Sequence, residues 1–589
     1  MGLPPPVRGE WLMVASERSD GMTYDLLIKN GRIIDGSGRP AFHGDVAVAG
    51  GKIVELGRLS GSARQTIEAD GRAVAPGFVD NHCHYDAQVI WDPLCTYSCH
   101  HGSTTVIIGN CSLSLAPVKP EAREKLAGML SYVEAIPMDV LQAGVPWNWE
   151  TFPQYMTAIG QRLGVNVGTF VGHSAVRLYA MGEDCSERAA TEAELEIMRR
   201  LVRESLDAGA LGLSITRNMN HFDIAGKRIP AACAPESELF ALADVLREAG
   251  TGVIQCGGGT NPEMKDRLLS RISEACGRPI MYNTLLEQAR QPGRWREHLA
   301  HVEETAKQGI RAIPLCNPGS ILNRFTMKNC QVFRSMPTWL PILQGPDADK
   351  MRAYRDPEIR AKLRAEVDAP LGPDSTFSQR WDLMVVEEPK LAKNRGLAGK
   401  HIAEIAKAQA KHPVDAFLDL AVDEELETGF CLGEINMDTE AVAQILGSPY
   451  AVVGLTDGGA HVQFHSNVSN PTRLLGYWVR EKKIMSLEHA VRRLTFDSAT
   501  AFGIYDRGLV QPGMVADLVV FDPDTVAPVK EDVVHDFPAN GWRMRELAEG
   551  IHYTVVNGEV LLEKGEHTGS HPGRVLRNAR YQTARNGGA

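Results

Sequence analysis

Two histidines one residue apart, His82 and His84, are the residues of this chain with the clearest potential for chemistry. They stand in the segment GFVDNHCHYDAQ. Side chains alternate between the two faces of a strand, so that both imidazoles point the same way while Cys83 points the other way. Two imidazoles on one face can bind one metal ion. The pair alone is a weak signal, because two polar residues in a loop give the same pattern.

Three further reactive side chains follow apolar runs elsewhere in the chain. Cys111 comes after TTVIIGN, His173 after VNVGTFVG and Asp457 after YAVVGLT. Each has an ordinary structural explanation: a buried thiol, a hydrogen-bonded core histidine, and a turn former before Gly458. If these runs are strands whose carboxyl ends meet at the same end of one sheet, however, two imidazoles, a thiol and a carboxylate come together. This donor set suits zinc.

The elements that must position these side chains alternate between short apolar runs and amphipathic segments. Eight runs with intervening helices predict a (β/α)8 TIM-like barrel of class α/β, over residues 76–504. In such a barrel, working residues stand at the carboxyl ends of the strands. An open doubly wound sheet is the alternative, but no glycine-rich phosphate loop follows the first run. The eight runs are AVAPGFVDNHCH, TTVIIGNC, VNVGTFVGH, ALGLSIT, GVIQCGG, RPIMYNTLL, IRAIPLC and YAVVGLTD.

Both ends of the chain carry strand patterns of another kind. Turn pairs at Asn30-Gly31, Gly50-Gly51 and Asn557-Gly558 stand between apolar runs and predict hairpins. Neither end has enough strands to bury a face, so we expect one small β-sandwich built from residues 23–75 and 505–566. Residues 1–22 are expected to be a flexible leader, and residues 567–589 a tail that packs on the surface or is partly disordered.

A long stretch separates the seventh and eighth runs. Residues 321–446 are too many for a connection in a compact barrel, and they contain Trp339, Trp381 and the helical segment KHIAEIAKAQAKHPVDAFLDLAV. We expect an inserted, mostly helical lid or subdomain over the mouth.

Composition narrows the class of protein. The 589 residues are 43% hydrophobic and 23% charged, which is ordinary for a globular protein, and no apolar run approaches membrane-spanning length. A net charge of −11 argues against a nucleic-acid partner. The eleven cysteines are sparse and form no CxxC pair, and no signal peptide is evident, so we expect a cytoplasmic protein with no membrane partner.

The order of several motifs resembles the amidohydrolase superfamily, and within it the D-aminoacylase (N-acyl-D-amino-acid deacylase) family. The resemblance covers most of the chain and is carried by YDLLIKNGRIIDGSG, APGFVDNHCHYDAQ, HHGSTTVIIGNCSLSLAP, GLTDGGAH and EGIHYTVVNGEVLLEKGEHTG. It implies a β-sandwich beside a metal-dependent barrel. It also implies that His82, His84, Cys111 and Asp457 fall on metal or catalytic positions of the family.

The chain departs from this family at two strand ends. The resemblance implies a histidine after the fifth strand and another after the sixth, which with the cysteine hold the more tightly bound zinc. Here those ends read GVIQCGGG and RPIMYNTLL, which place Gln255 or Cys256 and Asn283 at these positions. We therefore expect one zinc ion per chain, held by the four donors above, with Cys256 as a candidate fifth ligand and Asn283 as a further candidate site residue.

The reaction follows from these donors and from the resemblance. A bound zinc ion lowers the pKa of its water to about 7 and polarises an amide carbonyl. Asp457 can then move the proton from this water to the leaving amine, and His173 is a candidate to support the oxyanion. Arg473, in NPTRLLGYW, matches the family arginine that binds the substrate carboxylate. The same pattern fits a surface arginine at the start of a helix equally well.

The leading hypothesis is thus a metal-dependent hydrolase of amide C–N bonds. Its expected substrates are small molecules, N-acyl-D-amino acids or related N-acyl compounds, which can bear a carboxylate. Hydrolysis of a cyclic amide, carbamate or ester at the same site is the second hypothesis. A barrel that binds a ligand without turnover is the third, and the retention of Asp457 weighs against it because a binding site needs no base. The sequence leaves the oligomeric state open, and a homo-oligomer is one outcome.

Overall fold

The core of the molecule is an eight-stranded parallel barrel. The computed structural model describes residues 23–258, 267–372 and 375–586, so the expected leader lies outside the described residues. The sheet runs in the order β6-β7-β8-β9-β10-β11-β12-β16, and each of its strands overlaps one of the eight predicted runs. The strands are β6 (Phe78–Asp80), β7 (Ser103–Ile108), β8 (Asn166–Gly172), β9 (Gly212–Thr216), β10 (Val253–Gly257), β11 (Ile280–Tyr282), β12 (Ala312–Cys316) and β16 (Val452–Val453). The predicted barrel is confirmed.

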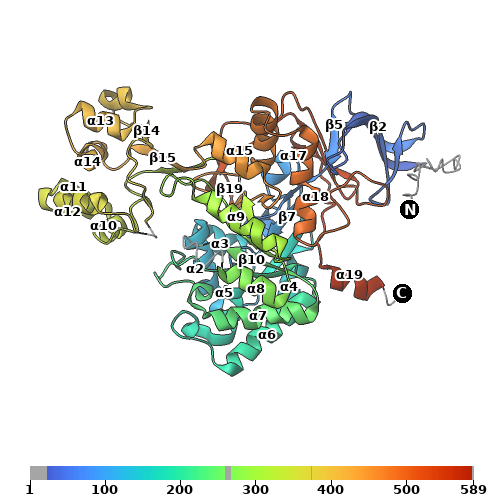
Figure 1. Cartoon of the computed structure of the whole chain (residues 1–589), viewed down its shortest axis with the longest axis horizontal. Coiled ribbons are helices and arrows are strands. Elements are labelled where there is room, and N and C mark those ends of the chain that lie inside the picture. Colours follow the sequence, from blue (N-terminus) through green and yellow to red (C-terminus); the bar gives the residue numbers. More distant parts are fainter. Residues whose placement is uncertain (1–22, 259–266, 373–374, 587–589) are drawn as a thin grey trace, which may run out of the picture.

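Helices between these strands cover the barrel (Figure 1). Their ends follow the expected signals: α6 (Glu192–Asp207) begins with a capping box between Thr191 and Glu194, and α7 (Glu236–Ala249) ends at Gly250, whose φ is 64°. Apolar faces of these helices pack on the strands, because a parallel strand is buried on both faces. The covering helices include α2 (Arg123–Glu134), α5 (His173–Met181), α6 (Glu192–Asp207), α7 (Glu236–Ala249), α8 (Leu269–Cys276), α9 (Arg294–Lys307), α15 (Thr439–Gly447), α17 (Leu487–Leu494) and α18 (Phe496–Ala501).

The barrel closes between its first and last strands through a side chain. The amide of Asn81 donates to the backbone of β16 at 2.9 Å and accepts from the backbone just beyond it at 3.3 Å. Past this point the two chains bond directly: the Asp457 N–H donates to the His82 carbonyl at 3.0 Å, and the His84 N–H donates to the Gly458 carbonyl at 2.7 Å. The closure therefore fixes the backbone of the HxH segment against that of Asp457.

Strands from both chain ends interleave in a second, nine-stranded sheet. Its order is β24-β23-β22-β17-β5-β1-β2-β3, with β4 paired to β1. The central β17 pairs antiparallel with β5 on one side and β22 on the other, so the N- and C-terminal segments form one sandwich domain. The strands are β1 (Tyr24–Ile33), β2 (Phe42–Ala49), β3 (Lys52–Gly57), β4 (Ala63–Glu68), β5 (Ala73–Pro76), β17 (Leu518–Phe521), β22 (Ile551–Val556), β23 (Glu559–Glu563) and β24 (Glu566–His567).

One of the three predicted turns is wrong. The Gly50-Gly51 and Asn557-Gly558 pairs connect the hairpins β2–β3 and β22–β23. Asn30-Gly31 instead lies inside the continuous strand β1, where the register to β2 shifts and Asn30 has a φ of 56°. This is a bulge, which a left-handed residue such as Asn30 can form as readily as a turn. Glycine is needed there because a Cβ at position 31 would lie 2.5 Å from Val74 Cγ2.

The stretch after β12 forms an inserted subdomain, which we define as residues 321–435. It has its own core, in which the rings of Phe333 and Trp339 stack at 4.2 Å. Figure 1 shows it in yellow and orange, on the opposite side of the barrel from the blue sandwich strands. It contains the expected helices α10 (Trp339–Gln344), α11 (Asp347–Arg355), α12 (Pro357–Asp368), α13 (Ile402–Ala408) and α14 (Pro413–Asp423). It also contains an antiparallel sheet that we did not predict, of β13 (Ile321–Phe325), β14 (Met384–Glu388) and β15 (Gly429–Ile435).

One boundary of the inserted subdomain differs from the expected one, whereas the tail packs on the barrel, which is one of its two expected outcomes. The helix α15, expected within the insertion, packs its apolar face against the barrel helices. In the tail, the side-chain amide of Asn578 donates to the carbonyls of Leu206 and Ala210 at the end of α6, and α19 (Ala579–Asn586) follows. Among the described residues no helix has the length and apolar content needed to cross a membrane.

Candidate metal centre

Three potential metal ligands meet at the carboxyl ends of β6 and β7. The ligand atoms of His82, His84 and Cys111 all lie within 4.8 Å of one another, and all three residues are buried. The Cys111 Sγ is 3.5 Å from His82 Nε2. The turn after β7 presents this thiol because Cys111 adopts a left-handed backbone with φ of 54°. The predicted alternation holds, since the Cys83 thiol points away and donates to the Ile107 carbonyl at 3.1 Å.

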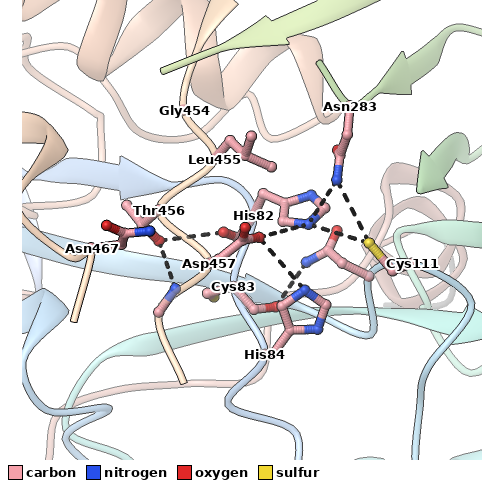
Figure 2. A network of polar contacts seen from close by, with 12 residues as sticks. His82, Cys83, His84, Cys111, Asn283, Gly454, Leu455, Thr456, Asp457 and Asn467 are labelled. Carbon is pink, nitrogen blue, oxygen red and sulfur yellow. Dashed lines mark hydrogen bonds and ion pairs between the residues drawn. The ribbon is translucent and has the colours of Figure 1, made fainter. Parts of the chain in front are cut away.

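Asp457, which follows β16, completes the donor group. Its Oδ1 lies 3.3 Å from His82 Nε2 and 3.7 Å from His84 Nε2. Figure 2 shows the carboxylate between the two rings, with Cys111 beyond His82. The hydroxyl of Thr456 orients this turn, because it donates to Asp80 Oδ1 at 2.7 Å and accepts from the Gly458 N–H at 3.0 Å. The structure thus brings together all four residues that we predicted as ligands.

The electrostatics of these four residues suit a cation. Burial lowers the pKa of His82 to about 3 and holds that of His84 well below its ordinary value, so both rings are neutral and can act as ligands. Burial, aided by the charge of Asp80, raises the pKa of Asp457 to about 7, and burial raises that of the Cys111 thiol. No lysine or arginine of the described residues forms an ion pair with Asp457. Two nitrogens, a sulfur and an oxygen without a cationic side chain are a donor set that fits zinc.

Amides occupy the two strand ends where the sequence departs from the family pattern. Gln255, on β10, accepts from the Cys111 N–H at 2.8 Å, and its amide nitrogen lies 3.5 Å from His82 Nδ1. Asn283, after β11, places its amide nitrogen 3.3 Å from His82 Nε2 and 3.6 Å from Cys111 Sγ. Both side chains therefore contact the donor group. Cys256 points to the other face of β10 and packs in the barrel core, so the structure does not bring it into this group.

His173 and Arg473 do not stand where we expected them. His173 begins α5, and its Nε2 lies 2.6 Å from Glu238 Oε1 on α7, beside the ion pair of Glu238 with Arg177. Arg473 ends α16 (Asn470–Arg473), and its guanidinium lies 3.7 Å from Glu546 Oε1. Neither residue lines the cavity at the metal donors. An apolar run followed by a polar residue specifies a strand end, but tertiary packing decides what that side chain contacts.

A cavity of about 690 Å³ opens at the donor group. His84, Cys111 and Asp457 line it together with loops of the barrel and residues of the inserted subdomain such as Arg334 and Thr376. The predicted lid therefore forms part of the wall. A cavity of this size accommodates a small-molecule substrate.

One buried carboxylate beside the donor group escaped the sequence analysis. Glu134, the last residue of α2, is buried, and its Oε1 lies 3.3 Å from His84 Nδ1. A carboxylate behind a metal-binding imidazole orients the ring and raises its basicity. The sequence around it, SYVEAIP, carries no signal for this role, although the rule that a histidine ligand has such a partner predicts a residue of this type.

Comparisons with known proteins agree with this architecture. The model of the amidohydrolase family matches residues 65–562. A D-aminoacylase of Alcaligenes xylosoxydans xylosoxydans is 29% identical over 95% of this chain and 99% of its own length, and an N-acyl-D-aspartate deacylase of the same organism is 30% identical over 94% and 95%.

Solved structures give the same result. A D-aminoacylase crystal structure superposes with a TM-score of 0.64 at 28% identity, covering 94% of this chain and all of that one. An N-acyl-D-glutamate deacylase from Bordetella bronchiseptica, in complex with zinc and a phosphonate mimic of the tetrahedral intermediate, has the same TM-score and coverage at 27% identity. A further D-aminoacylase structure is 27% identical to this chain. That enzyme has a binuclear metal centre, in which one metal ion gives activation and the second gives attenuation. This chain belongs to the amidohydrolase family, and within it to the group of the D-aminoacylases.

Proposed function

We propose that this protein is a zinc-dependent amidohydrolase that removes the acyl group from N-acyl-D-amino acids. The observation that carries the proposal is the convergence of His82, His84, Cys111 and Asp457 at a 690 Å³ cavity, in a chain that belongs to the D-aminoacylase group. The substrates of the named relatives support N-acyl-D-amino acids as the class.

We further propose that one zinc ion binds per chain. The four donors lie on one side of the mouth, at the ends of β6, β7 and β16, whereas Gln255 and Asn283 offer only amides on the other side. Amide groups are weaker zinc ligands than imidazole or thiolate. The described one-metal activation of a related D-aminoacylase is in line with a single working ion.

Asp457 and Glu134 carry out the protein's own part of the hydrolysis. The four donors would hold a zinc ion, which would supply an acidified water and polarise the substrate carbonyl. Asp457 accepts the proton of the attacking water as the new C–O bond forms, and it returns this proton to the amine nitrogen as the C–N bond breaks. Glu134, whose Oε1 lies 3.3 Å from His84 Nδ1, is placed to orient that imidazole. The products are a carboxylate and a free amino acid.

A panel of N-acetyl-D-amino acids tests the reaction. Zinc-loaded protein is expected to release acetate and the amino acid, and Asp457→Asn is expected to abolish release while the protein stays folded by circular dichroism. Inactivity of zinc-loaded wild type on the whole panel, with zinc shown to be bound, would contradict the proposal. Activity on a cyclic amide, carbamate or ester would then favour the second hypothesis, which the amides at Gln255 and Asn283 support, because they alter the wall beside the metal donors.

The compartment and the assembly state are part of the proposal. We place the protein in the cytoplasm, because all eleven cysteines are free thiols, as is usual for a reducing compartment. A homo-oligomer stays a prediction that a sedimentation measurement can test.

A further inference from the structure

The two amides at the ends of β10 and β11 form a closed chain of hydrogen bonds with Cys111. The Cys111 N–H donates to Gln255 Oε1 at 2.8 Å, and Gln255 Nε2 donates to Asn283 Oδ1 at 3.2 Å. Asn283 Nδ2 in turn donates to Cys111 Sγ at 3.6 Å, so that the chain returns to the residue from which it starts. Gln255 is buried and Asn283 is half-buried. Each amide is therefore held at both of its polar atoms.

This chain of hydrogen bonds fixes which atom Asn283 presents to the metal donors. A backbone N–H can only donate, so the side-chain atom of Gln255 that faces Cys111 is its oxygen. The nitrogen of Gln255 then faces Asn283 and requires the oxygen of that amide as its acceptor. Figure 2 shows the consequence, with the nitrogen of Asn283 directed at His82 and Cys111. Asn283 thus offers the donor group a hydrogen-bond donor, and its oxygen, the atom that could bind a cation, is held by Gln255.

One N–H of Asn283 becomes free when the donor group binds a metal ion. Asn283 Nδ2 lies 3.3 Å from His82 Nε2, the ring nitrogen that also lies 3.3 Å from Asp457 Oδ1 and 3.5 Å from Cys111 Sγ. A neutral imidazole nitrogen has one lone pair, which cannot both bind a metal ion and accept a hydrogen bond. A metal ion at His82 Nε2 therefore leaves this N–H of Asn283 without its acceptor. Asn283 lines the cavity, so the N–H is available to an oxygen atom of a bound substrate.

Other side chains that could support an oxyanion are engaged elsewhere. His173, the residue that we expected in this role, contacts Glu238 and does not line the cavity. The amide of Asn110, after β7, already donates to two backbone carbonyls. Gln255 does not line the cavity either. Asn283 combines a place in the cavity wall, contact with two metal donors and an N–H whose direction the protein fixes.

We propose that Asn283 is a catalytic residue that donates a hydrogen bond to the oxyanion of the tetrahedral intermediate. The inference rests on the proposed function, because it adds a residue to the same hydrolysis. As the water oxygen bonds to the acyl carbon, the electron pair of the C=O bond moves onto the carbonyl oxygen, and the Asn283 N–H donates to that oxygen. The hydrogen bond weakens again as the C–N bond breaks and the C=O bond re-forms. Gln255 is a positioning residue, because it acts through the orientation of Asn283. A donor that is oriented before the reaction stabilises developing charge without reorganisation.

Two probes of the same shape test the hydrogen bond apart from turnover. N-methylphosphonyl-D-alanine carries a charged tetrahedral oxygen, whereas N-methanesulfonyl-D-alanine has neutral oxygens in the same arrangement. Both are titrated calorimetrically into zinc-loaded protein, and wild type is expected to prefer the phosphonyl probe. Asn283→Leu keeps the size of the side chain and removes the donor, so it should weaken the phosphonyl probe about 10- to 100-fold, the range of a hydrogen bond to a charged group. The sulfonyl probe should change by less than about threefold, because its oxygens carry no full charge.

Kinetics and matched variants separate catalysis from positioning. For an N-acetyl-D-amino acid that wild type hydrolyses, Asn283→Leu should lower kcat on the order of 10²- to 10³-fold and change KM by less than about threefold, because the charge develops only in the transition state. Gln255→Met removes the donor to Asn283 and should weaken the phosphonyl probe by less than Asn283→Leu does. Asn394→Leu removes an asparagine of the inserted subdomain that contacts Asp423, and it should change neither titration.

Several results would overturn the inference. These are a wild type without preference for the phosphonyl probe, an equal weakening of both probes by Asn283→Leu, an unchanged kcat, or a loss of zinc from this variant, which would make Asn283 a support of the metal donors. Should Asn283→Leu fail to fold, as thermal unfolding would show, Asn283→Ala carries the same test. Selective weakening of the phosphonyl probe by Asn283→Leu, without hydrolysis of any N-acetyl-D-amino acid by wild type, would support the oxyanion site and contradict the proposed reaction. Normal hydrolysis by Asn283→Leu would leave the proposed reaction and remove Asn283 from it.

Discussion

The two sides of the barrel mouth differ in chemistry although the same fold builds them. The ends of β6, β7 and β16 present His82, His84, Cys111 and Asp457, whereas the ends of β10 and β11 present amides. The amides still contact the donors, because Gln255 and Asn283 lie within 3.5 Å of His82. A strand end thus specifies where a side chain stands, and the residue type at that place decides between metal binding and hydrogen bonding.

Removing a donor should have the largest effect. We expect His82→Ala to lose zinc and to lower kcat/KM on the order of 10³-fold or more, because metal catalysis contributes several kcal/mol and each 1.36 kcal/mol is a factor of ten. Elemental analysis after dialysis measures the zinc, and initial rates measure the activity. Cys83→Ala, next to it but on the opposite face of the strand, should keep both. A variant that loses zinc and keeps its activity would remove the metal from the reaction.

Replacing the amides at the ends of β10 and β11 with histidines tests the difference between the two sides of the mouth. The double variant Gln255→His with Asn283→His should raise the zinc content from one to two ions per chain, because both amides already lie beside Cys111 and His82. Metal content after dialysis against zinc-free buffer measures this change. Two tightly held ions in wild type would show that the amides do not prevent a second site.

Behind the donor side, Glu134 should have an intermediate effect. Glu134→Gln is expected to weaken zinc binding or to reduce turnover about 10- to 100-fold, the usual cost of losing the partner of a histidine ligand. Competition with a chromophoric chelator measures the zinc affinity. Glu124→Gln, on the exposed first turn of the same helix, is the control. An unchanged affinity and rate would reduce Glu134 to a packing role.

The smallest effect is expected from the loss of the Thr456 hydroxyl, which precedes Asp457 in the turn after β16. Thr456→Val removes hydrogen bonds to Asp80 and to the Gly458 N–H, and it should lower the free energy of unfolding by about 1–3 kcal/mol, because buried polar groups lose their partner. Urea denaturation measures this change. Thr428→Val, which removes a buried hydroxyl in the inserted subdomain, is a control that should leave zinc affinity unchanged, whereas Thr456→Val should reduce it. Equal zinc affinity in the two variants would mean that the hydroxyl does not orient Asp457.

The sequence by itself determined the barrel and the donors. Eight apolar runs of strand length, separated by amphipathic segments, can bury their surfaces only as a parallel sheet covered by helices. Once the strands gather, their carboxyl ends meet, so His82, His84, Cys111 and Asp457 could be placed at one mouth from spacing alone. These predictions depend on local periodicity and on a general property of the fold.

The tertiary structure decided every contact that depends on an unrelated segment. It paired His173 with Glu238, placed Arg473 beside Glu546, and brought Glu134 to His84. It also made Asn30-Gly31 a bulge and directed Arg334 of the inserted subdomain into the cavity. Periodicity within one segment specifies which face is buried, but the partner of a buried polar side chain is set by long-range packing, because a hydrogen bond or ion pair depends on where the second segment lies.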